Sequence, residues 1–185
     1  VRQIVFGEPI ENIPNLVYRE EDQIRLTPKK NVKLDQLFDL EHLSSNDYDP
    51  ENPFPLSSIR GCIKAELEDR CSFCSMDHKL MMMRAKQVWE QIDLLNAQYG
   101  FDYFYETGDS FVVGRYPEQL LNARPEHLKE IKFRGYASPD QITPEMIDIL
   151  KQLNVQEIFL GVESVDETIL NQAGKKYNRA DIDLA

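Results

Sequence analysis

The feature that most constrains this chain is a short stretch that holds all of its cysteines. They are Cys62, Cys71 and Cys74, and the last two form a C-x-x-C pair. An odd number of cysteines excludes a complete disulfide framework. Clustered thiols in a chain that looks intracellular are typical of metal ligands rather than of disulfide bridges. Structural zinc sites and most iron–sulfur clusters take four protein ligands. Three thiolates therefore predict either a borrowed fourth ligand, which fits a structural role, or an open metal position, which fits catalysis.

His78 is the nearest candidate for a fourth ligand. It completes the spacing C-x8-C-x2-C-x3-H, which is close to that of a small zinc finger, so a structural zinc module that supports protein contacts is one hypothesis. Zinc fingers replace the core of small domains, however, whereas this stretch lies in a chain with a core of its own. An electron-transfer iron–sulfur protein is a further hypothesis, and the missing fourth cysteine argues against it.

From residue 54 onward the sequence alternates between strand and helix patterns. Four strand–helix units in a row predict an α/β fold with a parallel sheet. Because a complete eight-fold barrel takes about 250 residues, we expect a partial, TIM-like β/α barrel, with the cysteines after its first strand, at the catalytic edge. The expected strands are residues 54–59, 101–105, 131–136 and 155–162; the expected helices are residues 78–98 (with Met81, Met82 and Met83 on it), 117–129 (broken by Pro125), 144–153 (capped by Thr143), and one from Ser164 or Asp166 to Leu170.

The N-terminal part of the chain carries weaker signals. Residues 1–50 are predicted to be a linker or extension, with a short hairpin between residues 15 and 26, ahead of a main domain at residues 51–185. The chain opens on Val1 rather than Met and ends at Ala185, just after a predicted helix begins. We therefore expect it to be part of a longer protein.

The overall composition limits the kinds of partner. The formal net charge is −11, from 21 basic and 32 acidic residues. This charge argues against a nucleic-acid groove, because phosphate binding rests on clustered Lys and Arg. No run approaches the roughly 20 apolar residues of a membrane span, and the polar start does not read as a signal peptide. Clustered thiols without a disulfide framework predict a reducing, cytoplasmic location.

The cysteine stretch resembles the cluster loop of the radical S-adenosylmethionine (radical SAM) superfamily. The usual form of that loop is C-x3-C-x2-C after the first barrel strand, with an aromatic residue just before the last cysteine. Here Phe73 precedes Cys74, whereas eight residues instead of three separate Cys62 from Cys71. The longer gap needs only to bulge outward between the ligands. The resemblance implies that the three cysteines are the metal ligands.

The resemblance extends over most of residues 54–178. The sequence from Gly161 to Ser164, followed by Leu170 and Lys175, is similar to the G-[VI]-E-S…L…K segment of the cobalamin-linked and methylthiotransferase-like branches. In the family, an acidic motif at the end of the second strand binds the methionine amino group, and later strands supply further contacts. The residues that the resemblance implies as cofactor contacts are Phe73, Glu106, Asp109, Arg134, Glu163 and Ser164.

The resemblance also implies the chemistry. Three thiolates leave one iron of a [4Fe–4S] cluster open, and S-adenosylmethionine (SAM) binds that iron. One electron then cleaves SAM to a 5′-deoxyadenosyl radical, which abstracts a hydrogen from substrate, while the protein places the cofactor. We therefore expect an enzyme with a [4Fe–4S] cluster and SAM as cofactors, and with an electron donor and an unidentified substrate as partners. The cobalamin-binding histidine motif is not in this sequence, so cobalamin is not carried over.

Overall fold

The computed structural model divides the chain into two compact units. The first is Val1–Lys33 and the second is Leu34–Ala185. The predicted domain boundary after residue 50 stays a prediction, because it falls among residues whose structure is not described. The described residues are 7–30, 49, 52–67, 70–75 and 80–185.

The first unit contains the predicted hairpin. After a short 3-10 helix, η1 (Ile10–Asn12), strands β1 (Val17–Glu20) and β2 (Gln23–Leu26) pair antiparallel. Glu21 turns the chain between them with a positive φ of 52°. The base of the hairpin is closed where the Leu16 amide donates to the Thr27 hydroxyl at 2.8 Å.

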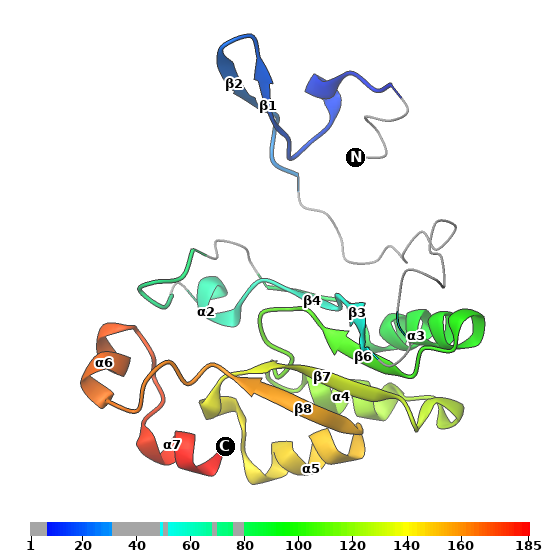
Figure 1. The fold of residues 1–185 in the computed structure, drawn as a ribbon, viewed down its shortest axis with the longest axis vertical. Coiled ribbons are helices and arrows are strands. Elements are labelled where there is room, and N and C mark those ends of the chain that lie inside the picture. Colours follow the sequence, from blue (N-terminus) through cyan, green and yellow to red (C-terminus); the bar gives the residue numbers. More distant parts are fainter. Residues whose placement is uncertain (1–6, 31–48, 50–51, 68–69, 76–79) are drawn as a thin grey trace. The chain divides into compact units, whose positions relative to one another are not determined.

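The second unit is built on a sheet of four parallel strands (Figure 1). Its strands lie in the order in which they occur in the sequence, and each pairs with the next. In the described part of the chain they form an open sheet, so the predicted partial β/α barrel is confirmed. The four strands are β3 (Phe54–Leu56), β6 (Tyr103–Glu106), β7 (Lys132–Ala137) and β8 (Val155–Leu160).

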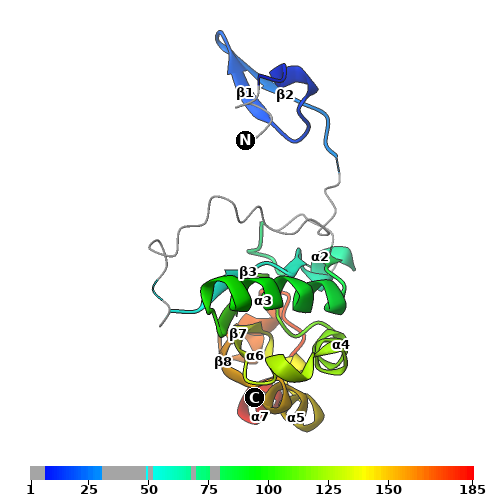
Figure 2. The same cartoon turned by 90° about the vertical axis from the view of Figure 1, so that its right-hand side faces the viewer.

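Three helices connect these strands and pack against one face of the sheet (Figure 2). They are α3 (Ala85–Tyr99), α4 (Tyr116–Ala123) and α5 (Pro144–Gln152). None of the helices in the described residues is long and apolar enough to cross a bilayer. The remaining elements of this unit are β4 (Ile59–Arg60), α2 (Ile63–Glu66), β5 (Met81–Met82), η4 (Glu126–Leu128), η5 (Pro139–Gln141), α6 (Glu167–Gln172) and α7 (Arg179–Leu184).

Local signals set the ends of these helices. The Thr143 hydroxyl accepts from the Met146 amide at 3.2 Å, so it caps α5 one residue before Pro144, as predicted. Gly100 ends α3 in the left-handed region, with φ of 75°, which costs glycine little. The Asp166 carboxylate caps α6 by accepting from two amides of its first turn. Each of these residues is visible as a boundary in the sequence.

One predicted element is wrong at its start. The helix expected from residue 78 begins at Ala85, and Met81 and Met82 form the strand β5. β5 pairs antiparallel with β4, placing Met82 opposite Ile59 and Met81 opposite Arg60. The apolar run fits a helical period equally well, so the periodicity did not separate the two states; the partner strand lies about twenty residues upstream and decides it.

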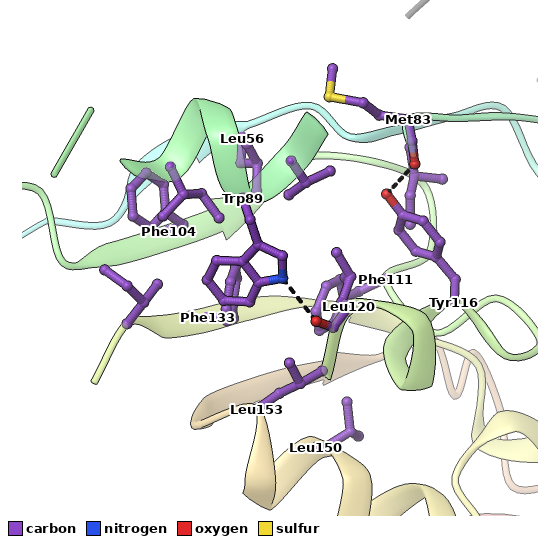
Figure 3. Packing of buried hydrophobic residues seen from close by; sticks show 14 of the residues in the cluster. Leu56, Met83, Trp89, Phe104, Phe111, Tyr116, Leu120, Phe133, Leu150 and Leu153 are labelled. Carbon is purple, nitrogen blue, oxygen red and sulfur yellow. Dashed lines mark hydrogen bonds between the residues drawn. The ribbon is translucent and has the colours of Figure 1, made fainter. Parts of the chain in front are cut away.

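The core lies between the sheet and its helices (Figure 3). Phe133 on β7 is fully buried, and its ring packs against Trp89 on α3, with centroids 5.7 Å apart, and against Phe104 and Phe111. The Trp89 indole nitrogen donates to the Leu120 carbonyl at 2.8 Å, which satisfies its polar atom inside the core. This layer holds the strands rigidly, so the loops at their carboxyl ends start from fixed positions.

Phe133→Ala is expected to lower the free energy of unfolding by about 3 to 5 kcal/mol, because it leaves a cavity among three aromatic rings. Tyr136→Ala is the matched control. It lies on the opposite face of the same strand, 43% exposed, and is expected to cost about 1 kcal/mol. Urea unfolding of both variants measures the difference. Equal losses would contradict the placement of the core on the Phe133 face.

Candidate functional site

The cysteine-containing loop leaves and re-enters the fold through a narrow neck. β4 and β5 pair at this neck, and the Met83 amide donates to the Ser58 carbonyl at 2.8 Å. Residues 61–80 therefore form a closed excursion from the carboxyl end of β3, which we call the cysteine loop. The sequence prediction of a loop at this edge is confirmed.

The three thiols sit in different parts of this loop. Cys62 lies directly before the single-turn helix α2, whereas the Cys74 amide donates to the Cys71 carbonyl in a tight turn at 3.0 Å. None of the three forms a disulfide, Cys62 and Cys71 are partly buried, and Cys74 is exposed. Among the described residues, the side chains do not form a group of three or more His, Cys, Asp or Glu close enough to hold a metal ion. His78 lies outside the described residues.

The tip of the loop docks on the segment that follows α6 (Figure 1). The Ser72 amide donates to the Ala173 carbonyl at 3.0 Å. Gly174 has a φ of +71°, and a Cβ added there would lie 3.0 Å from the Arg70 carbonyl and 3.5 Å from the Cα of Cys71. Only glycine satisfies both the conformation and the close approach. The C-x-x-C turn is thus held against Gly174, one residue before the lysine of the predicted motif.

Lys175 brings the tip of the loop together with the end of β8. Its ammonium lies 3.2 Å from the Glu163 carboxylate and 5.4 Å from the centre of the Phe73 ring. Burial acts to lower the pKa of Lys175, but the hydrogen bond to Glu163 and the negative potential of Cys71 outweigh it and raise the pKa. Two predicted cofactor contacts, Phe73 and Glu163, therefore lie around one cation. Glu163 occupies the left-handed region with φ of 60°.

A second lysine, Lys64, lies close to Lys175, and its ammonium is buried without a hydrogen-bond partner among the described residues. The Lys64 ammonium, two residues after Cys62, is shielded from solvent and has no hydrogen-bond partner in the described part of the chain. It lies 5.9 Å from the centre of the Tyr177 ring, on which Lys175 also rests at 5.6 Å. Burying an unpaired charge is costly. An anion would balance this ammonium, and a [4Fe–4S] cluster held by three thiolates would carry negative charge, so the residues present fit the predicted group.

Glu106 is the most deeply buried of the predicted contacts, at the end of β6. Its carboxylate accepts from the Ser58 hydroxyl at 2.5 Å, from the Ser58 amide at 3.0 Å and from the Gly108 amide at 2.9 Å, with a longer contact of 3.4 Å to the Ile59 amide. Burial raises the pKa of Glu106 to about 7, although these hydrogen bonds act to lower it. The carboxylate is thus surrounded by donors from the neck of the cysteine loop.

The other predicted contacts lie apart from this group. Arg134 is on the sheet face away from the helices, with its guanidinium 4.7 Å from the Tyr105 ring centre and 3.4 Å from the Glu157 carboxylate. Asp109 is exposed beyond the end of β6. The Ser164 hydroxyl accepts from the Asp166 amide at 3.0 Å, which shapes the turn into α6. SAM contacts by all six residues stay predictions.

Sequence reasoning missed three residues of the site. Ser58 and Lys64 flank Cys62 by a few residues, and Tyr177 lies two residues after Lys175. The Tyr177 hydroxyl donates to the Gly161 and Val162 carbonyls at 2.5 and 3.0 Å, which fixes the end of β8. Proximity to the cysteines was the one available signal for Ser58 and Lys64. The burial that gives them a role comes from contacts with distant segments.

Comparison with known protein families identifies the family to which the chain belongs. The model of the radical SAM superfamily matches residues 56–183, which include strands β6, β7 and β8, all three cysteines and the segment that holds Lys175. The chain belongs to the radical SAM superfamily. No curated protein matches the chain.

Solved radical SAM structures share the fold. The cobalamin-dependent SAM radical enzyme OxsB, solved with aqua-cobalamin and SAM bound, is 18% identical with a TM-score of 0.72, over 97% of this chain and 28% of that one. The radical SAM methyltransferase TsrM from Kitasatospora setae, solved with cobalamin and a [4Fe–4S] cluster bound, is 18% identical with a TM-score of 0.75, over 99% of this chain and 40% of that one. The chain thus spans well under half of either protein.

The buried carboxyl of Glu106 makes stability depend on pH. The ordinary pKa of 4.5 applies to the unfolded chain, and the folded value is about 7, so between these the folded protein holds a proton that the unfolded chain has released. The free energy of unfolding therefore falls as the pH rises from about 4.5 to about 7, by about 3 kcal/mol in total. Glu106→Gln is expected to lose this fall, measured by urea unfolding across that range.

Glu118→Gln serves as the control for this prediction. Glu118 lies partly exposed at the surface and is paired with Arg115, whose hydrogen bond lowers the pKa of Glu118. Its replacement is expected to leave the fall in stability intact. A pH profile in Glu106→Gln that matches the unmodified protein would contradict the assignment.

Proposed function

We propose that this chain is the part of a radical SAM enzyme that holds a [4Fe–4S] cluster through Cys62, Cys71 and Cys74. One observation carries the proposal: three cysteines that form no disulfide lie in a single loop at the carboxyl end of β3, and this loop is tied at its neck to the end of β6 and at its tip to the segment after α6. That edge is where β/α barrels carry out their chemistry. When bound, the cluster supplies the electron that cleaves the carbon–sulfur bond of SAM at the open iron.

The residues of this chain hold and orient the cofactor in this proposal. Phe73 is 60% exposed and lies directly before Cys74, so its ring is free to stack on adenine. Glu163 and Ser164 follow the end of β8, and Arg134 faces the side of the sheet that the helices leave open. With Asp109 they are proposed as the surroundings of SAM, whereas Glu106 is proposed to hold the neck of the cysteine loop in place. Lys64 and Lys175 supply positive charge beside the thiolates.

The partners follow from the same proposal. A catalytic cycle that consumes one electron needs an electron donor, and hydrogen abstraction needs a substrate. We propose that the substrate is selected in part by regions that correspond to the portions of the longer relatives outside the match. Cobalamin accompanies the relatives named above, whereas this sequence lacks the histidine motif that binds it. Free thiols that serve as ligands favour a cytoplasmic location. The structural zinc hypothesis is not favoured, because the family model matches the cysteine loop together with the sheet behind it.

Anaerobic reconstitution of the full chain with iron and sulfide tests the proposal. We expect a brown protein with about four irons and four sulfides per chain. After reduction, its electron paramagnetic resonance spectrum is expected to change when SAM is added, because SAM binds the open iron. A colourless protein that binds zinc would overturn the proposal. A cluster spectrum that SAM does not change would instead support an electron-transfer role.

Cys71→Ala is expected to abolish retention of the cluster, because two thiolates remain for four irons. Ser72→Ala is the matched control: the neighbouring side chain is exposed, and the amide that binds Ala173 is kept. The measurement is the iron and sulfide content after desalting. A full complement in Cys71→Ala would refute its assignment as a ligand.

A further inference from the structure

We propose that Glu106 is a positioning residue for the cysteine loop, which it holds at the neck through Ser58. Glu106, Ser58, Tyr116 and the backbone of Met83 form one buried hydrogen-bonded group, which we call the neck network. This inference rests on the proposed function for its consequence, the placement of Cys62, but its structural part concerns the protein without any cofactor.

One half of the neck network fixes β4, the strand that leads into the cysteine loop. The Glu106 carboxylate accepts from both the hydroxyl and the amide of Ser58, and it lies within 3.4 Å of the Ile59 amide. Ser58 and Glu106 are both fully buried. A buried carboxylate with several donors is held far more tightly than one in water, because the donors cannot be replaced by solvent. The residues just ahead of Cys62 are therefore tied to the end of β6.

The other half fixes the end of β5, the strand that leads out of the cysteine loop. The Tyr116 hydroxyl, at the start of α4, donates to the Met83 carbonyl at 2.8 Å (Figure 3). Burial raises the pKa of Tyr116 to about 12, while a hydrogen bond with the Ser58 side chain acts in the opposite direction. The Met83 amide in turn donates to the Ser58 carbonyl. Ser58 thus links the two strands of the neck to β6 on one side and to α4 on the other.

Gly108 shows how closely the neck is seated. A Cβ at this position would lie 2.7 Å from the Ile59 carbonyl oxygen and 3.1 Å from a Glu106 carboxylate oxygen. The 2.7 Å contact is shorter than packed side chains tolerate, and it is with a backbone atom that cannot turn aside. The absence of a side chain lets the Gly108 amide reach the carboxylate at 2.9 Å. The backbone after β6 and the backbone before Cys62 are in direct contact.

The neck network acts on one end of the cysteine loop more than on the other. Two residues separate Ile59 from Cys62, and one of them, Gly61, turns the chain with φ of 83°. The tip, with Cys71 and Cys74, is held independently by Ala173 and Gly174. Loss of the neck network should therefore release Cys62 while the C-x-x-C turn stays docked.

This role differs from direct contact between Glu106 and SAM. In the present arrangement the carboxylate oxygens are engaged by protein donors, so the effect of Glu106 on the cofactor passes through the position of the loop. A direct ligand would change the affinity for SAM and leave the protein without cofactor unaltered. A positioning residue changes the loop before any cofactor binds.

Hydrogen exchange of the full chain without cofactor tests the inference. In Glu106→Gln we expect the amides of residues 58–62 to exchange at least about tenfold faster, because the Gln NH2 group replaces one of the two acceptor oxygens and leaves some of the Ser58, Ile59 and Gly108 donors without an acceptor. Residues 71–74 are expected to keep their rate. Trp89→Phe is the matched control, since it also removes one buried hydrogen bond, to Leu120, but lies away from the neck. It should leave the exchange of residues 58–62 unchanged.

A second variant and a second measurement complete the test. Ser58→Ala removes one donor and is expected to speed exchange in the same residues by a smaller factor, which keeps the inference testable if Glu106→Gln does not fold. In the reconstituted protein, Glu106→Gln should lose cluster faster on desalting than Trp89→Phe.

Unchanged exchange of residues 58–62 in the folded variants, or a change no greater than in Trp89→Phe, overturns the inference. Faster exchange in a protein that never takes up iron supports the neck network and overturns the proposed function instead.

Discussion

The burial of one carboxylate organises the catalytic edge of this fold. Removing Glu106 from water is costly, and the donors of Ser58, Gly108 and Ile59 offset the cost only if they stay in place. The requirement is mutual, because the Ser58 amide and hydroxyl are also fully buried and need an acceptor. The end of β6 and the start of the cysteine loop therefore fix each other, and a change on either side leaves buried polar atoms unsatisfied.

The parallel sheet explains why distant segments meet at this edge. All four strands run in one direction, so the carboxyl ends of β3, β6 and β8 lie at the same edge of the sheet. The segment after β3 carries the cysteines, Glu106 is the last residue of β6, and the segment after β8 carries Glu163 and then Lys175. These loops also need a rigid base, and the aromatic layer around Phe133 on the helix side of the sheet supplies it. Rigid strands and chemically active loops are thus parts of one arrangement.

Local sequence signals predicted the elements well, and contacts between distant segments account for what they missed. Thr143, Gly100 and Asp166 mark helix ends through their own side chains or conformations, so they can be read from the sequence. Met81 and Met82 fit both a helix and a strand, and pairing with Ile59 and Arg60 decides between them. The roles of Ser58 and Lys64 depend on burial against β6 and Tyr177, which no local pattern encodes. The cysteines could be predicted as site residues from the sequence because their chemistry, and not their packing, identifies them.

Charge at the cysteine loop runs against the charge of the chain. The protein carries a net charge of −11, yet two lysine ammonium groups are withdrawn from solvent near the thiols. One is paired with Glu163, and the other has no hydrogen-bond partner among the described residues. A lysine buried among neutral groups would lower its pKa and give up its proton, whereas Lys175 shifts in the opposite direction. Its surroundings therefore favour a cation already. An anionic group bound by the three thiolates would complete the charge balance, supply Lys64 with the partner it lacks, and draw the neck and the tip of the loop toward one centre.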